Sequence, residues 1–119
     1  MKFLLLIAIC FIFGDADAES WSPEQRTLAG VYLAAHVIDW GQTRRIAREP
    51  HIWHEYNPLL PRHPSIAQVN RHFLLVPIVG YFIADALPSR HRTTALYWAA
   101  TIQVSVVARN HYLGIRVSF

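Results

Sequence analysis

The segment from Phe73 to Ala84, FLLVPIVGYFIA, constrains the fold of this chain more than any other part of its sequence. The segment is apolar on every face, and it carries Pro77 and Gly80 within a run that otherwise favours a helix. A helix without a polar face has to be surrounded completely, either by protein or by lipid. A chain of 119 residues has no core large enough to surround one of its own helices. Lipid is therefore the simpler solvent, and Pro and Gly are also tolerated better inside membrane helices.

The composition favours the same environment. Apolar residues make up 53% of the chain and charged residues only 16%, whereas soluble domains carry about 25% charged residues. Beyond residue 18 there are ten Arg, no Lys and six acidic residues, which gives a net charge of +4. The Arg are spread over loops and helix ends rather than gathered into one stripe, so we expect no nucleic-acid partner.

The first 18 residues have the anatomy of a secretory signal peptide. Lys2 supplies the positive start, residues 3–14 are uncharged, and small residues precede a cut before Glu19. An uncleaved membrane anchor is the alternative. Cleavage would remove Cys10, the one cysteine in the chain, and would exclude disulfides, thiol catalysis and cysteine–zinc sites from the mature protein.

Three helices are expected in residues 19–119, at about 23–48, 65–87 and 90–112, with a polar connector over 51–64. The predicted fold class is therefore all-α. We expect a single domain, a three-helix bundle embedded in a membrane, behind the N-terminal signal peptide.

Serine residues mark the expected start of each helix. Ser22 and Gln25 form a capping-box pattern around a proline at the first helical position, and Ser65 repeats the pattern with Gln68. Ser89 is expected to cap the third helix.

Polar residues within the helices argue against the membrane. No uninterrupted apolar run reaches the roughly 18 residues of a confident span. The first helix contains His36 and Asp39, and the third contains Gln103 and Ser105. A soluble exported helical domain that binds a partner is therefore an alternative.

The distribution of Arg predicts an orientation. With an exported N-terminus, the loop between the first two helices and the C-terminal tail would lie in the cytoplasm. Seven Arg fall on that side: Arg44, Arg45, Arg48, Arg62, Arg71, Arg109 and Arg116. Three fall on the opposite side: Arg26, Arg90 and Arg92. This asymmetry follows the positive-inside rule, so we predict a bacterial inner-membrane protein with its N-terminus outside and its C-terminus in the cytoplasm.

A polar cluster is expected near the inner end of the first helix. His36, Asp39 and Thr43 are spaced by three and four residues and share one helix face. An ionisable group within a span needs a partner, and Arg109 would lie at a matching depth in the third helix. The predicted cluster consists of Asp39, Thr43, Glu55, Asn57, Arg109 and Asn110. Its simplest role is a polar clasp that fixes helix packing, and the alternative is a small functional site at the membrane face.

The sequence carries the pattern Asp-x-x-x-Thr … Glu-x-Asn-Pro, at Asp39, Thr43, Glu55, Asn57 and Pro58. This pattern resembles that of small uncharacterised integral membrane proteins encoded by phages and prophages. The resemblance extends to the stretches at 63–70 and 107–110 and covers most of residues 27–119. The resemblance implies a membrane protein. If the protein is encoded by a phage, its role would be in lysis, superinfection exclusion or envelope remodelling. The resemblance supplies no catalytic residue.

Metal and catalytic sites have weaker support in the sequence. The residues of suitable type for a metal are His36, Asp39, His51, His54 and Glu55. The His51–His54 spacing lies next to a proline and differs from the His-Glu-x-x-His motif of zinc peptidases. The sequence also has no Gly-x-Ser-x-Gly elbow and no phosphate-binding glycine loop. We therefore predict no catalytic residue, no metal and no cofactor. A membrane-embedded metal-binding protein or hydrolase using Asp39, His36 and Glu55 is the alternative.

The function that follows is a non-enzymatic accessory or interaction protein of the cell envelope. Its expected partners are membrane lipid and either a second copy of the chain or another envelope protein, because the small domain has little core of its own.

Overall fold

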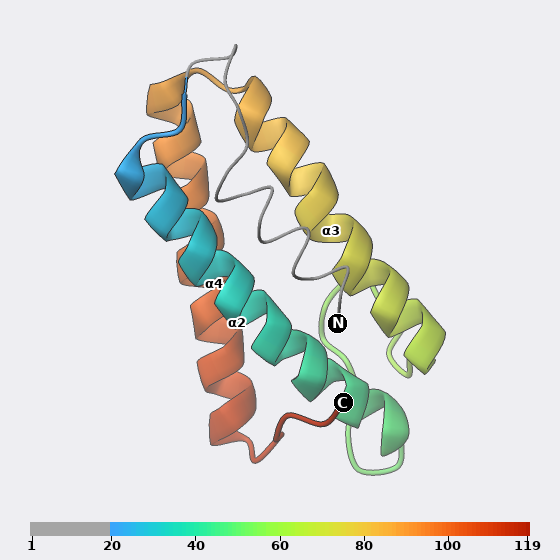
Figure 1. The fold of residues 1–119 in the computed structure, drawn as a ribbon. Coiled ribbons are helices and arrows are strands. Elements are labelled where there is room, and N and C mark those ends of the chain that lie inside the picture. Colours follow the sequence, from blue (N-terminus) through green and yellow to red (C-terminus); the bar gives the residue numbers. More distant parts are fainter. Residues whose placement is uncertain (1–19) are drawn as a thin grey trace.

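The computed structural model describes residues 20–119, and the predicted signal peptide at 1–18 lies outside this part of the chain. The fold consists of three helices, α2 (Pro23–Arg48), α3 (Ile66–Ala86) and α4 (Ser89–Tyr112), with no strand between residues 20 and 119 (Figure 1). The all-α prediction is confirmed. Each helix begins and ends within about two residues of its expected bounds.

Two of the three predicted helix starts have the expected caps. The Ser22 hydroxyl accepts a hydrogen bond from the Gln25 backbone N–H, and the Gln25 side chain accepts one from the Ser22 N–H. Ser65 and Gln68 form the same reciprocal pair at the start of α3. The prediction for α4 is wrong, because Ser89 is its first residue and the preceding proline offers no side-chain cap.

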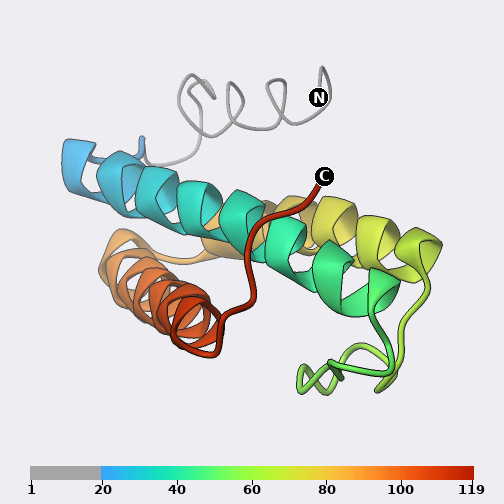
Figure 2. The same ribbon diagram turned by 90° about the horizontal axis from the view of Figure 1, so that it is seen from below.

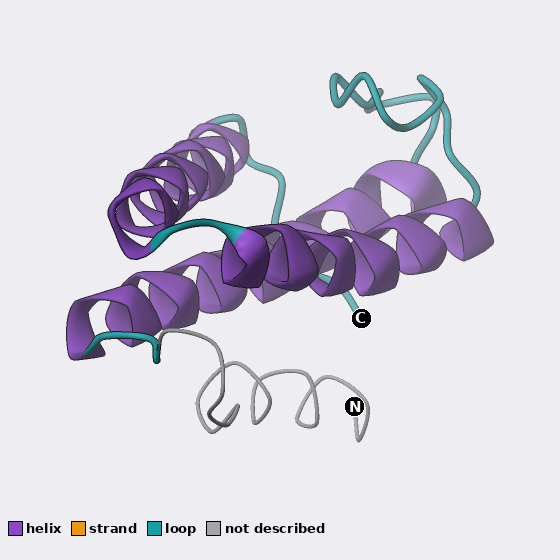
Figure 3. Cartoon of the chain, turned by 90° about the horizontal axis from the view of Figure 1, so that it is seen from above, coloured by secondary structure: helices purple, strands orange, loops and turns teal. Residues whose placement is uncertain are grey.

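Successive helices run in opposite directions, with α2 in the middle of the packing (Figure 1). α2 packs most extensively against α4 and less against α3, whereas α3 and α4 have little mutual contact (Figures 1 and 2). A short turn joins α3 to α4 at one end of the bundle, and a longer irregular connector joins α2 to α3 at the other (Figure 3). We call these the turn end and the connector end.

The apolar core is small. One cluster near the turn end consists of Trp21, Ala29, Leu33, Ala84 and Leu96. A second, toward the connector end, consists of Trp40, Val69 and Phe73. Many other large apolar side chains lie on the outside of the bundle. On α3 and α4 they are Leu75, Ile78, Val79, Phe82, Ile83, Tyr97, Trp98, Ile102, Val104, Val106 and Tyr112.

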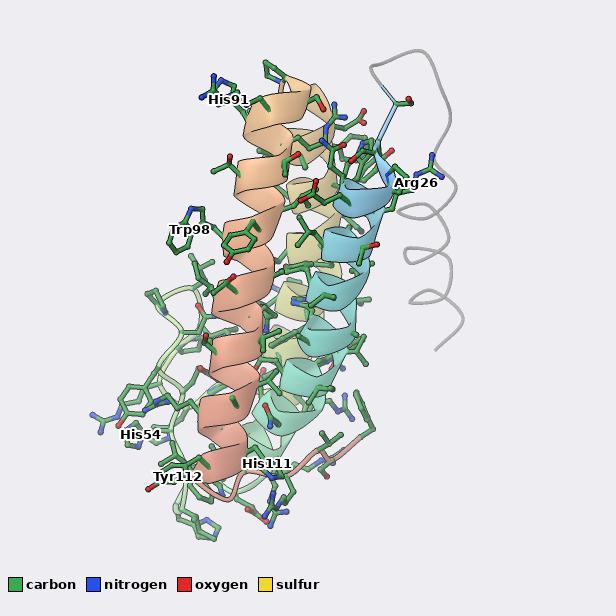
Figure 4. All side chains as sticks on the ribbon, turned by 90° about the vertical axis from the view of Figure 1, so that its left-hand side faces the viewer. Arg26, His54, His91, Trp98, His111 and Tyr112 are labelled. Carbon is green, nitrogen blue, oxygen red and sulfur yellow. The ribbon has the colours of Figure 1, made fainter. Side chains whose placement is uncertain are left out.

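The exposed apolar side chains lie on the flanks of the bundle, while several charged and imidazole groups lie at its ends. Trp98 projects from the side of α4, whereas Arg26 and His91 lie at the turn end and His54 and His111 at the connector end (Figure 4). Among the described helices, α3 is long and apolar enough to cross a membrane. Its 21 residues extend for about 30 Å, which matches the hydrocarbon thickness of a bilayer. Only 17% of its most apolar window is buried by protein, unlike the core helix of a soluble domain.

The C-terminal tail folds back across α2. Gly114 has a φ of 87°, and the N–H groups of Gly114 and Ile115 donate to the carbonyls of His111 and Asn110, which is the Schellman ending of a helix. The tail then reaches α2, where the Ser118 N–H donates to the Gly41 carbonyl at 3.0 Å. A Cβ on residue 41 would overlap the Val117 side chain, so glycine is required for this close approach.

Candidate functional site

Asp39 is the centre of the buried polar cluster between α2 and α4. Its Oδ2 accepts a hydrogen bond from Gln103 Nε2 at 2.8 Å. Its Oδ1 accepts from Asn110 Nδ2 at 3.2 Å and from the Thr43 hydroxyl at 3.3 Å. The carboxylate is buried and is held entirely by uncharged amide and hydroxyl donors.

A second layer of amides ties the same contact together. The Asn110 amide also donates to Gln42 Oε1 at 3.3 Å, and Gln42 Nε2 donates to the Val107 carbonyl at 3.3 Å. Gln42 and Asn110 are both buried. Because these amides and the Asp39 carboxylate bind one another, the network fixes the contact between α2 and α4.

The expected pair between Asp39 and Arg109 is not formed. Arg109 is the residue before Asn110, so it points to a different side of α4, and its guanidinium carbon lies 4.9 Å above the ring of Tyr56. The sequence therefore identified the correct end of α4 and included Asn110 in the cluster, but it paired Asp39 with Arg109. A neighbouring amide, not the guanidinium, faces the carboxylate.

Glu55 and Asn57, also predicted for this cluster, shape the connector instead. Glu55 Oε1 accepts hydrogen bonds from the backbone N–H groups of Tyr56 and Asn57, at 2.9 and 2.8 Å. Asn57 Nδ2 lies 3.1 Å from His72 Nε2 and links the connector to α3. Of the six predicted residues, Asp39, Thr43 and Asn110 are in direct contact, and the other three belong to the connector and its surroundings.

A cavity of about 260 Å³ lies beside this region at the connector end. Its walls come from the end of α2, the connector, the end of α4 and the tail. They include Ile46, Glu55, Tyr56, Arg109 and Ile115. The cavity therefore combines a buried apolar floor with an exposed guanidinium at its rim.

His36 serves the backbone of α3. Pro77 lies inside α3 and has no N–H, so the carbonyl of Phe73, four residues earlier, has no helical donor. His36 Nε2 lies 2.9 Å from that carbonyl oxygen, and because the oxygen can only accept, Nε2 carries the proton. The other ring nitrogen faces the Tyr32 hydroxyl at 3.5 Å. His36 therefore compensates for the proline, as neighbouring helices do in membrane proteins.

The five weak metal candidates do not come together. Among residues 20–119, no three His, Cys, Asp or Glu side chains are placed to hold a metal ion. His36 binds a backbone carbonyl, and His54 Nε2 lies 2.7 Å from the Tyr56 hydroxyl. The alternative of a metal-binding protein therefore gains no geometric support from the described residues.

The turn end contains a buried guanidinium, that of Arg92, which the sequence had placed among the charges outside the membrane. Arg92 is only 1% exposed. Its Nε donates to the Ala84 carbonyl at 2.9 Å, and one terminal nitrogen donates to the carbonyls of Asp85 and Leu87 at 3.0 Å each. The last carbonyls of a helix have no intrahelical donor, so Arg92 satisfies the C-terminal end of α3.

Two further side chains close the turn end: Trp21, just before α2, and Gln25, in the first turn of α2. Trp21 Nε1 donates to the Asp85 carboxylate at 2.8 Å, and the Trp21 ring lies 5.3 Å from the Arg92 guanidinium carbon. Gln25 Nε2 lies within 3.0 Å of the Ser89 carbonyl and hydroxyl and 2.9 Å from the Thr93 hydroxyl. The sequence carried little signal for this cluster: Arg92 follows a short interhelical turn, and Gln25 was assigned only to the capping box at the start of α2.

No family model, curated protein or solved structure matches this chain. The resemblance to phage and prophage membrane proteins therefore stays a prediction, and the function has to be argued from the geometry.

Proposed function

We propose that this chain is a small integral membrane protein of the cell envelope with a non-enzymatic, accessory or interaction role. The observation that carries the proposal is the distribution of polarity in the bundle. The buried polar and charged side chains are Gln25, His36, Asp39, Gln42, Thr43, Arg92 and Asn110. Large aliphatic and aromatic side chains cover the outside of α3 and α4. In water this arrangement would be unfavourable, whereas in a bilayer polar groups face the interior of the bundle and apolar groups face lipid.

The charge at the two ends supports an orientation. Seven of the nine Arg outside the buried Arg92 lie at the connector end, where the side-chain carboxylates that are not buried, among residues 20–119, are those of Glu49 and Glu55. Arg26 and Arg90 lie at the turn end. The proposed topology places the connector end in the cytoplasm and the turn end outside, in a bacterial inner membrane.

A non-enzymatic role is favoured by the closed polar cluster. The hydrogen-bonding groups of Asp39, Gln42 and Asn110 are engaged with one another and with neighbouring groups. Such a network fixes the packing of α2 on α4 and leaves no reactive group aimed at a substrate. Binding of lipid, of a second copy or of another envelope protein by the apolar flanks is the role that this arrangement supports. The phage origin implied by the resemblance remains part of the proposal.

Two isoleucines provide a test with a built-in control. Ile102, in the middle of α4, and Ile52, in the connector, are each 60% exposed. In a bilayer, Ile102→Arg would place a charge among lipid chains, at a cost of about 3 kcal/mol, whereas Ile52→Arg would remain outside the hydrocarbon. We expect wild-type and Ile52→Arg chains to resist carbonate extraction from membranes, and Ile102→Arg to lose at least half of its membrane-integrated amount. Release of the wild-type chain into the soluble fraction, or equal behaviour of the two variants, contradicts the proposal.

A further inference from the structure

We infer that the cavity at the connector end binds the phosphate headgroup of an anionic phospholipid. This inference rests on the proposed membrane location and names the lipid class that one site would recognise. The cavity of about 260 Å³ is smaller than the pockets of about 300–1,000 Å³ that enclose drug-sized ligands. It suits a headgroup with its first chain carbons rather than a complete molecule.

Arg109 is the group that would bind the phosphate. Among the described residues no carboxylate pairs with it, whereas Arg45 at the same end pairs with Glu49 at 3.2 Å. Its guanidinium lies over the Tyr56 ring and lines the cavity. Stacking on an aromatic ring leaves the N–H donors at the edge of the guanidinium plane available, and these match the oxygens of a phosphate.

The ring that supports Arg109 is itself held in place. The Tyr56 hydroxyl lies 2.7 Å from His54 Nε2, and the Tyr56 N–H donates to Glu55 Oε1 at 2.9 Å. These contacts pre-organise Tyr56 and, through it, the guanidinium. A binding group that is already positioned loses less conformational entropy when a ligand arrives.

The floor and one wall of the cavity are suited to a lipid and not to a free inorganic anion. Ile46 and Ile115 are buried, and Ile52 and Leu113 extend the apolar surface toward the rim. A phosphate at Arg109 would therefore lie directly beside a surface for the first methylene groups of an acyl chain. A fully polar ligand would gain nothing from these four side chains.

The charge of the lining indicates the class of headgroup. Glu55 also lines the cavity, but its Oε1 accepts two backbone hydrogen bonds and its Oε2 is shielded from solvent, so Arg109 is the charged group that faces a ligand. Phosphatidylglycerol carries a net negative charge at its phosphate, whereas phosphatidylcholine carries no net charge. The cavity is therefore assigned to a headgroup of the phosphatidylglycerol type.

Binding can be measured with the full chain in a mild neutral detergent, using dihexanoyl-phosphatidylglycerol as the probe. We expect Arg109→Gln to weaken binding roughly tenfold or more, because a charge-assisted hydrogen bond is lost. Tyr56→Leu should weaken it by about threefold or more through loss of the stacked support. Arg116→Gln is the matched control. Arg116 lies at the same end, is exposed and contacts His111, but it does not line the cavity, so we expect less than a twofold change.

Three results would overturn the assignment. One is equal weakening by Arg109→Gln and Arg116→Gln, which would indicate attraction by overall charge alone. Another is equal affinity for dihexanoyl-phosphatidylcholine. The third is equal affinity for glycerol 1-phosphate, because the apolar floor would then contribute nothing. If the wild-type chain resists carbonate extraction but gives one of these three binding results, the lipid site is wrong and the membrane proposal stands. If carbonate releases the wild-type chain, the membrane proposal and the lipid site both lose their basis.

Discussion

At the turn end, the guanidinium of Arg92 is enclosed by main-chain carbonyls, whereas toward the connector end the carboxylate of Asp39 is enclosed by side-chain donors. Both groups are buried and each has at least three hydrogen bonds. The difference lies in the partners. The carbonyls at the end of α3 belong to the backbone, and the end of any helix presents such groups. The amides around Asp39 are side chains, and they depend on the presence of Gln103 and Asn110 at these positions.

This contrast separates two uses of a buried charge. Arg92 completes a helix end, so its contribution to stability is tied to the backbone of α3 and to the α3–α4 turn. Asp39 selects how α2 and α4 fit together, because another register of the two helices would leave the carboxylate without donors. The cavity adjoins the second arrangement and not the first. The turn end is therefore the structural end of the bundle, and the connector end is where we expect binding.

The largest expected effect is that of Arg92→Ala. It would remove the side-chain hydrogen bonds to three carbonyls near the end of α3 and would open a cavity beside Trp21, so we expect a loss of stability of at least about 3 kcal/mol. Arg90→Ala, on the exposed side of the same helical turn, should cost less than about 0.5 kcal/mol. Thermal unfolding followed by circular dichroism in a mild detergent measures both. Similar melting temperatures for the two variants would contradict the account of the turn end.

The next effect is that of Asp39→Ala, which removes the carboxylate that accepts hydrogen bonds from the Gln103 and Asn110 amides. We expect a loss of about 2–4 kcal/mol, with Asp39→Asn retaining part of the stability because it keeps one acceptor oxygen. Arg109→Ala should cost less than about 1 kcal/mol, since it removes one exposed contact with an aromatic ring. The melting temperature in detergent tests all three variants.

Charge exchange provides the sharper control on Asp39. If the carboxylate were paired with Arg109, the double variant Asp39→Arg with Arg109→Asp would recover much of the stability lost in the single variants. The observed partners predict no recovery. The Arg at position 39 would face the N–H donors of two amides and would have no acceptor there. Recovery would support the Asp39–Arg109 ion pair that the sequence predicted. It would also contradict the conclusion that uncharged side chains hold the Asp39 carboxylate.

The sequence predicted the helices well because local rules determine where they begin and end. The Ser22 and Ser65 capping boxes act within a few residues of their own position, and both form as expected. The cap expected at Ser89 failed. Its turn is stabilised by Arg92, a few residues later, and by Gln25, from the start of α2; the distant contact leaves no local pattern.

The partners of Asp39 show where sequence reasoning ends. Helix spacing placed Asp39 and Thr43 on one face, and depth matching brought in the end of the third helix. Choosing between Arg109 and its neighbour Asn110 required the rotation of α4 about its axis, which differs by about 100° from one residue to the next. The preference for an opposite charge pointed to Arg109. In the structure, the packing of α4 on α2 instead brings Asn110 and Gln103 into contact with the Asp39 carboxylate.

His36 lies between the two ends and combines features of both. Like Arg92 it binds a carbonyl of α3, and like Asp39 it is positioned by the packing of α2. Its partner carbonyl, on Phe73, is available because Pro77 cannot donate to it. The role of His36 therefore depends on a proline in another helix, and this dependence can be measured.

A double-mutant cycle between His36→Leu and Pro77→Ala gives the smallest of the expected effects. In the wild-type background, His36→Leu leaves the Phe73 carbonyl without a donor. In the Pro77→Ala background, the new N–H of residue 77 donates to that carbonyl, so the loss of His36 should cost about 1 kcal/mol less. Pro77→Ala combined with Asn110→Ala shares no partner and should be additive within about 0.5 kcal/mol. If the His36 cycle is additive as well, His36 is held by packing against Phe73 rather than by its carbonyl, and only Arg92 uses a buried side chain to complete the backbone of α3.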